Sequence, residues 1–455
     1  MDLNRRHLIG ASAAGVAGAL AASPEAARAV QLISALGRDA TQYGVRPGSP
    51  EDQTRVLQRA IDEAARAQAP LALPPGVYRS GLLRLSSGTQ LVGVRGATKL
   101  VFNGGASLLQ SEGADHIGIS NITLDGGGIP LPARRGLVHG LGGRDIRIID
   151  CEIAGSGGAG IWLEQVSGDI SGNIITATAS TAIVSFDARG LLVSRNTILG
   201  TNDNGIEILR SAIGDDGTLV VDNRIENVAN TSGGSGQYGN AINVFRANNV
   251  MVRGNRIRNA AFSAVRGNAA SNLQILGNTC SAIGEVALYA EFGFEGAMIA
   301  NNIVDGAAVG VSVTNFNEGG RLAVVQGNLI RNLAPHRPAG TDPNDGAGIG
   351  IGIEADTAVS GNVIENAPYI GIAAGWGQYL RDVTINANVV RGADYGIAVS
   401  VAPGAGSAVI ADNMISGARL GAIVGMEWKK PVTGDLSKDG AERYAQLSVV
   451  GNRVR

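Results

Sequence analysis

The chain has 455 residues, of which 67 are glycine and only 4% are aromatic. Glycine is about twice as frequent as in an average protein, which is typical of a fold with many tight turns. The formal net charge of −2 predicts neither a basic nucleic-acid-binding surface nor an acidic disordered tail, so no nucleic-acid partner is expected.

Residues 1–29 are typical of an export signal. Arg5 and Arg6 precede an apolar stretch rich in alanine and glycine, and Ala27-Arg28-Ala29 fits a small-x-small cleavage site. The pair of arginines favours twin-arginine export, with that machinery as a partner and a periplasmic or secreted destination. An ordinary secretory signal with two chance arginines is the alternative. No later segment is long and apolar enough to span a bilayer, so we expect no membrane association after cleavage.

Residues 30–85 predict an N-terminal cap and the first strands. Residues 47–68 have the pattern of one amphipathic helix, with Ser49 as the N-cap and Pro50 in the first turn. Residues 71–85 then indicate a strand, a Pro-Pro-Gly turn and a second strand. The helix is expected to cover the open apolar end of a stacked-coil fold.

This opening resembles the N-terminal segment of pectate-lyase-like β-helix proteins. The resemblance rests on Tyr43-Gly44-Val45, on residues 58–62 of the helix and on Leu73-Pro74-Pro75-Gly76-Val77-Tyr78. It implies a right-handed parallel β-helix. Together with the leader, the chain is similar to a group of exported bacterial repeat proteins without an assigned activity.

Residues 86–455 carry a repeated Asn-x-apolar motif, usually preceded by glycine. Successive markers are 23 to 39 residues apart, and they are Asn173, Asn196, Asn223, Asn255, Asn278, Asn302, Asn328, Asn362, Asn388, Asn413 and Asn452. Such a unit is too short for a βαβ crossover and suits three short strands with three turns. We therefore predict an all-β, single-stranded parallel β-helix of about a dozen coils. The repeated asparagines are interpreted as structural, in left-handed turns with each amide bonding the next coil.

A second strand in each coil carries a small-Ile-x-apolar pattern whose alternation predicts inward and outward positions. The first outward column is expected to contain Trp162, Val184, Glu207, Asn243, Arg266, Tyr289 and Ser312. The second column, two residues later, is expected to contain Glu164, Phe186, Leu209, Phe245, Asn268, Glu291 and Thr314. Insertions at 229–239, 334–346 and 427–446 are expected to form loops beside a binding face.

The polar types on this face favour an extended polysaccharide or an envelope glycan as partner. An enzyme that eliminates or epimerises a uronide needs a base near the sugar C5, a cation and a group that steadies the enolate. We assign Arg266, Tyr289 and Glu207 as candidate catalytic residues. The candidate substrate-binding residues are Asn243, Glu291, Asn204, Arg246 and Arg210. A solvated face without function, or a non-catalytic scaffold of the cell envelope, is the alternative.

Cofactor signals are weak, and we assign no metal ligands. Asp215-Asp216 and the segment 342–346 are candidates for Ca²⁺, although turns alone favour these residue types. Trp376 and Trp428 either stack on sugar rings or pack internally, and the composition favours packing.

Residues 201–208 (TNDNGIEI) resemble a segment of polygalacturonase-type hydrolases. The position of that family's catalytic-region aspartate carries Asn204, and Asn240-Ala241 stands where those hydrolases have paired aspartates. A two-carboxylate hydrolysis site of that type is therefore not expected.

Overall fold

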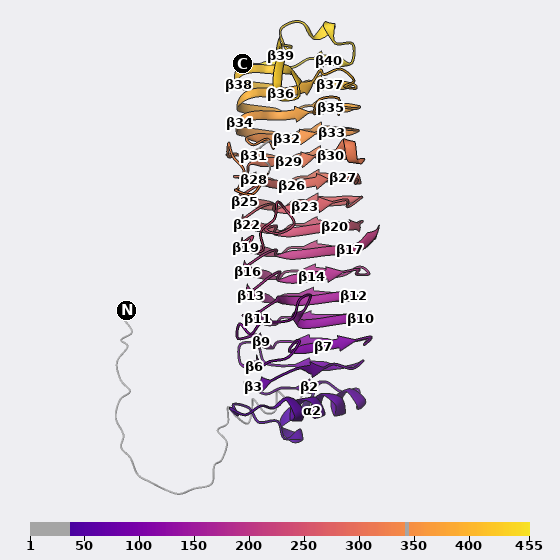
Figure 1. Ribbon diagram of the computed structural model, residues 1–455, viewed down its shortest axis with the longest axis vertical. Coiled ribbons are helices and arrows are strands. Elements are labelled where there is room, and N and C mark those ends of the chain that lie inside the picture. Colours follow the sequence, from indigo (N-terminus) through magenta and orange to yellow (C-terminus); the bar gives the residue numbers. More distant parts are fainter. Residues whose placement is uncertain (1–36, 342–344) are drawn as a thin grey trace, which may run out of the picture.

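The computed structural model describes residues 37–341 and 345–455, and its strands stack into one long solenoid (Figure 1). The fold is an all-β parallel solenoid of about 14 turns with one short N-terminal helix, which confirms the predicted fold class with slightly more turns. The predicted export signal lies outside the described residues and stays a prediction. None of the described helices is both long and apolar enough to cross a membrane.

The solenoid has three faces, and each turn visits them in the same order. The first face, which carries the small-Ile strands, includes β4 (Leu83–Arg84), β7 (Leu109–Glu112), β14 (Ile183–Phe186), β17 (Ile206–Asp215), β20 (Ile242–Asn248), β23 (Val265–Asn268), β26 (Val286–Glu291), β29 (Val309–Val313) and β32 (Ile349–Ile353). The second face includes β1 (Arg38–Asp39), β2 (Leu71–Ala72), β5 (Gln90–Val92), β8 (Gly118–Ser120), β15 (Leu192–Ser194), β18 (Leu219–Val221), β21 (Met251–Arg253), β24 (Leu273–Leu276), β27 (Glu295–Ala300), β30 (Arg321–Gln326), β33 (Thr357–Ser360), β35 (Val383–Asn386), β37 (Ala408–Ala411) and β40 (Leu447–Val450).

The third face follows the asparagine markers. It includes β3 (Gly76–Ser80), β6 (Thr98–Phe102), β9 (Thr123–Asp125), β11 (Glu152–Ala154), β13 (Ile174–Thr178), β16 (Thr197–Thr201), β19 (Arg224–Val228), β22 (Arg256–Ala260), β25 (Thr279–Ile283), β28 (Ile303–Asp305), β31 (Leu329–Arg331) and β41 (Arg453–Val454). Five longer strands turn a corner between faces: β10 (Gly136–Ile149), β12 (Ala159–Ser171), β34 (Val363–Ala374), β36 (Val389–Ser400) and β38 (Met414–Glu427). The one antiparallel strand pair within the described ranges joins β38 to β39 (Lys430–Asp435), near the C-terminal end of the stack (Figure 1).

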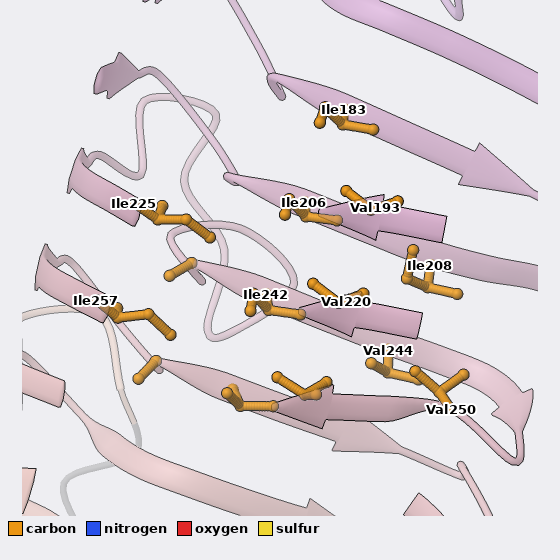
Figure 2. Close-up of a cluster of buried hydrophobic side chains, with 14 of the residues drawn as sticks. Ile183, Val193, Ile206, Ile208, Val220, Ile225, Ile242, Val244, Val250 and Ile257 are labelled. Atoms are coloured by element: carbon orange, nitrogen blue, oxygen red, sulfur yellow. The ribbon is translucent and has the colours of Figure 1, made fainter. Parts of the chain in front are cut away.

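Short β-branched side chains fill the interior in columns. Ile183, Ile206 and Ile242 of the first face lie directly above one another in register. Figure 2 shows this column beside Val193 and Val220 of the second face, with all of these side chains pointing into the same core. Each is fully buried. Because neighbouring parallel strands are only ~4.8 Å apart, the same residue type repeats without leaving gaps.

A continuous ladder of asparagine amides runs along the corner between the second and third faces. Each Nδ2 donates to the Oδ1 of the next marker at 2.9–3.0 Å, from Asn173 through to Asn452. Each Nδ2 also donates to a backbone carbonyl, as Asn255 does to Val220 at 3.0 Å. The structural interpretation of the repeat agrees with these bonds. One detail was wrong: the left-handed residue is the one before the marker, for example Asp222 with φ 57° before Asn223.

The N-terminal helix is shorter than predicted. Helix α2 spans Thr54–Arg66 rather than 47–68, and Gln53 at its N-cap makes no side-chain capping bond. Ser49 Oγ instead accepts the backbone N–H of Glu51 at 3.3 Å, which ends its availability as a cap for a longer helix. The predicted amphipathic character is correct, since Leu57, Ala60, Ile61 and Ala64 on one side of the helix are buried against the first coil. Short 3-10 helices occupy Ala40–Tyr43, Phe316–Glu318 and Ala441–Arg443.

Candidate functional site

The two predicted outward columns exist on the first face. Register pairs the members of the first column in the predicted order, Trp162, Val184, Glu207, Asn243, Arg266, Tyr289 and Ser312. The second column is paired in the predicted order from Glu164 to Glu291. The structure thus brings most of the predicted site residues onto one face.

The predicted residues form two groups, and two arginines lie apart from both. Asn204 Nδ2 donates to Glu207 Oε1 at 2.5 Å. Arg266 contacts both Glu291 and Tyr289. Arg210 lies within β17 and Arg246 within β20, where Arg210 Nη1 donates to the Ala188 carbonyl and Arg246 Nη1 to the Ser211 carbonyl.

The loop at 229–239 lies over Asn204 and Asn243 on this face. Asp203 fixes it by accepting the backbone N–H and the hydroxyl of Ser232, each at 2.9 Å. The carbonyl of Gln237 accepts Asn204 Nδ2 at 3.1 Å and Asn243 Nδ2 at 3.4 Å. Glu207 and Asn243 are consequently buried although they point away from the core.

A buried ion network joins this loop region to the loop at 334–346. Arg266 Nε donates to Glu291 Oε1 at 2.6 Å, and its Nη1 lies 3.8 Å from Glu285 Oε2. Arg337 Nη1 lies 2.8 Å from the other oxygen of Glu285. The Arg266 guanidinium also lies 5.3 Å from the Tyr289 ring centroid, and the side chain is 12% exposed. Its charge is therefore balanced by protein carboxylates, and its assignment as a catalytic residue stays a prediction.

An open cleft of about 490 Å³ lies on the same face, toward the C-terminal coils. Its floor continues the first outward column through Tyr289, Ser312, Gly352, Ala373 and Ala398. A Cβ built on Gly352 would meet no atom within 4 Å. Small side chains on the floor thus leave room that larger residues in the earlier coils fill.

Aromatic rings form one wall of this cleft. Trp376 and Trp428 are edge to face, with ring centroids 5.5 Å apart and planes at 80°. They are 40% and 50% exposed, so a large part of each indole faces solvent. Tyr369 also lines the cleft and packs edge to face on Tyr395 at 6.0 Å. The preference for internal packing of both tryptophans was therefore only half correct, because they pack on each other and remain open to the cleft.

Glu354 is a cleft residue that the sequence interpretation missed. It follows β32 in the second outward column, and its carboxylate accepts the backbone N–H of Phe316 at 2.6 Å. Burial raises the pKa of Glu354 to about 7, a value suited to proton transfer near neutral pH. The sequence contains a signal that could have identified Glu354. The 34 residues between Asn328 and Asn362 must include one small-Ile strand, and Gly348 with the alternating Ile349, Ile351 and Ile353 has that pattern.

Glu207 makes stability depend on pH in a testable way. Burial raises the pKa of Glu207 from its ordinary 4.5 to about 7. The folded protein then keeps a proton that the unfolded chain loses, so stability falls as pH rises from about 4.5 to about 7. We expect Glu207→Gln to remove up to about 3 kcal/mol of that fall, measured by urea unfolding at pH 5 and pH 8. The exposed Glu365→Gln should leave the fall unchanged, and an equal fall in Glu207→Gln would contradict the assignment.

Few observations in the described residues support a Ca²⁺ site at either candidate segment. Within 37–341 and 345–455, no three His, Cys, Asp or Glu side chains gather as they would at a metal site. Asp216 accepts a short hydrogen bond from the Thr218 hydroxyl, and Asp345 lies 3.6 Å from Arg337. Asp342 lies outside the described residues.

Comparison with known proteins supports the fold alone. Residues 98–213 match a model described as "Right handed beta helix region", which agrees with the handedness implied by the N-terminal resemblance. The catalytic unit of a GH87 α-1,3-glucanase from Streptomyces thermodiastaticus is similar, with TM-score 0.50, 17% identity and coverage of 91% of this chain and 68% of that one. The surface adhesin PfbA of Streptococcus pneumoniae is also similar, with TM-score 0.50, 15% identity and coverage of 87% and 95%.

A mannuronan C-5 epimerase A-module from Azotobacter vinelandii has a TM-score of 0.44 and 15% identity, with coverage of 91% of this chain and 100% of that one. No sequence among the curated proteins matches the chain. At such identities the likeness concerns architecture, and the chemistry has to be argued from the residues of this chain.

Proposed function

We propose that the protein binds an extended polysaccharide in the cleft between Tyr289 and Trp428. The observation that carries this proposal is the pair of solvent-facing indoles, Trp376 and Trp428, above a floor of Gly352, Ala373 and Ala398. Sugar rings present flat faces of C–H groups that pack on indole rings, while their hydroxyls need polar partners at the rim. Thr314 lines the same cleft and supplies a hydroxyl group.

The charges around the cleft favour a neutral glycan over a uronide. A uronide needs cations for its carboxylates, and the two arginines nearby, Arg266 and Arg337, are already paired with Glu291 and Glu285, respectively. Lys429, whose Nζ lies 6.0 Å from the Trp376 ring centroid, is the other basic residue of the lining. Glu354 and Asp345 add acidic groups to the lining. A uronide, which the sequence raised as one candidate among the polysaccharides, therefore becomes the second choice, and the binding test below includes it.

Processing of the glycan is a second candidate function, favoured by Glu354. Its carboxyl group lines the cleft with a pKa of about 7, so it is present both as acid and as base at neutral pH. Tyr289 lies on the floor of the same cleft. A lyase-like or epimerase-like reaction in the cleft requires the substrate to lie over the open part of the first outward column. That part is on the C-terminal side of Glu207 and Arg266. The fold is shared with a glucanase, which is consistent with a carbohydrate partner, and with an adhesin, and it points to no particular reaction.

Binding to a polysaccharide panel tests the proposal. We expect neutral glucans, mannans and uronides to be ranked by affinity electrophoresis, with at least one neutral polymer retarding the protein. Trp376→Ala and Trp428→Ala should each weaken that binding about tenfold or more, equivalent to about 1.4 kcal/mol. Met298→Ala is the control, because Met298 is similarly exposed on the second face.

Three outcomes would count against parts of this proposal. No retardation by any polymer would contradict polysaccharide binding and leave the envelope scaffold as the better interpretation. Binding that survives both tryptophan substitutions would place the glycan elsewhere. Retardation by uronides alone would reverse the ranking of neutral over acidic sugars.

A further inference from the structure

A continuous apolar stripe runs up the third face, away from the cleft. Ile303, Leu329, Val363, Val389 and Met414 occupy the same outward position in five successive coils. All except the half-buried Leu329 are more than a third exposed. The stripe ends at Thr279 on one side and at Arg453 on the other. Contiguous apolar patches on soluble proteins are uncommon and tend to mark contact surfaces.

A row of alternating charges lies beside the stripe, two residues later in each strand. In coil order it reads Asp305, Arg331, Glu365 and Arg391, with Ser281 before it and Ser416 after it. Within the chain, Arg331 pairs with Asp305 at 2.8 Å and Arg391 with Glu365 at 3.5 Å. All four side chains are at least a third exposed, so each can take a further partner, although Asp305 also accepts from Asn332 Nδ2 at 2.8 Å.

The order of these charges is complementary to its own reverse. If a second copy approaches with its coils running the opposite way, Asp305 meets Arg391 of that copy and Arg331 meets Glu365. The same operation places Leu329 against Val363, Ile303 against Val389, and Ser281 against Ser416. A two-fold axis parallel to the strands of the third face generates this arrangement. No like charges of the row face each other in it.

We infer that the third face is a self-association surface, on which two chains pack antiparallel through the apolar stripe and the charge row. Six coils at ~4.8 Å per coil give a contact about 29 Å long. The two columns are only about 7 Å apart, so the contact covers on the order of a few hundred Å² per partner. This area is well below the roughly 800 Å² per partner of a standard stable interface, so the dimer should be weak and concentration-dependent. The cleft on the first face stays open in both copies. The inference is thus independent of the proposed glycan binding.

Sedimentation velocity over a concentration series tests the surface. We expect the wild-type chain to shift from monomer toward dimer as its concentration rises. Val363→Lys should shift the midpoint to at least tenfold higher concentration. Val409→Lys should not, and it is a matched control because both valines are 41% exposed while Val409 lies on the second face. A wild-type chain that stays monomeric at every concentration, or equal effects of the two substitutions, would overturn the inference.

Mixing two charge variants tests the antiparallel arrangement. Arg331→Glu alone places the introduced glutamate against Glu365 of the other copy twice per dimer, and Glu365→Arg alone places two arginines together, so each variant should be monomeric. In an equimolar mixture every facing pair is again opposite in charge, and dimers should return. Dimers in either single variant, or none in the mixture, would overturn the arrangement. Circular dichroism of each variant checks that the solenoid is intact.

Discussion

Replacing Asn255 by aspartate is expected to lower the free energy of unfolding by at least about 3 kcal/mol. The amide of Asn255 is completely buried, accepts from Asn223, and donates to the Val220 carbonyl and to Asn278 Oδ1. A carboxylate keeps the accepting role but removes both donors, and it places a charge beside two oxygens. Each lost bond leaves a buried group unsatisfied.

Urea unfolding followed by circular dichroism measures this effect. Asn452→Asp is the matched control, because Asn452 is the last rung of the ladder and is only half-buried. We expect its loss of stability to be less than half as large. Equal unfolding midpoints for wild type and Asn255→Asp would show that the ladder contributes little.

Replacing Arg266 by methionine is expected to lower stability by about 3–5 kcal/mol, because it leaves buried carboxylates without their cation. Glu291 loses its 2.6 Å partner, and Glu285 keeps Arg337 as its one remaining cation and the Ser263 hydroxyl as a donor. The loops at 229–239 and 334–346, which meet over this network, should then become sensitive to limited proteolysis. The pair Arg224–Glu226 has the same 2.6 Å separation, but its arginine is 61% exposed. Arg224→Met should therefore cost no more than about 1 kcal/mol.

The same variant separates a structural from a substrate-binding role of Arg266. If the guanidinium only contacts substrate, Arg266→Met will lose glycan binding while it unfolds at the wild-type urea concentration. If the network is structural, unfolding shifts and the cleft tryptophans still bind glycan under native conditions. A shift in unfolding no larger than that of Arg224→Met would contradict the burial argument.

The faces of the solenoid could be predicted from the sequence repeat, whereas the burial of the site residues could not, because it depends on the loops. Spacing of the asparagines placed Glu207, Asn243, Arg266 and Tyr289 in one column, because a solenoid repeats the same backbone path in each turn. The loop at 229–239 has no periodicity, so nothing in its sequence shows that it folds over Glu207. A column position was thus predicted correctly as outward, while its burial was not.

The cleft itself was hidden by two local effects. The glycines among residues 346–352 made the strand that precedes Glu354 hard to recognise. Its isoleucines nevertheless alternate in the same way as the inward residues of the other small-Ile strands. Trp376 and Trp428 are 52 residues apart and come together because Trp428 lies in the turn between β38 and the antiparallel strand β39. Such long-range contacts depend on a loop path that the repeat does not determine.

The amide ladder separates the length of the loops from the stacking of the coils. Rungs joined across 32, 34 and 39 residues have bonds of 2.9–3.0 Å, as do rungs joined across 23. Insertions beside the first face therefore leave the spacing at the opposite corner unchanged. A loop exchanged, lengthened or shortened at these sites should alter what the molecule recognises while its stacking stays constant. The solenoid is therefore a constant scaffold, and loops of different specificity can be placed on it.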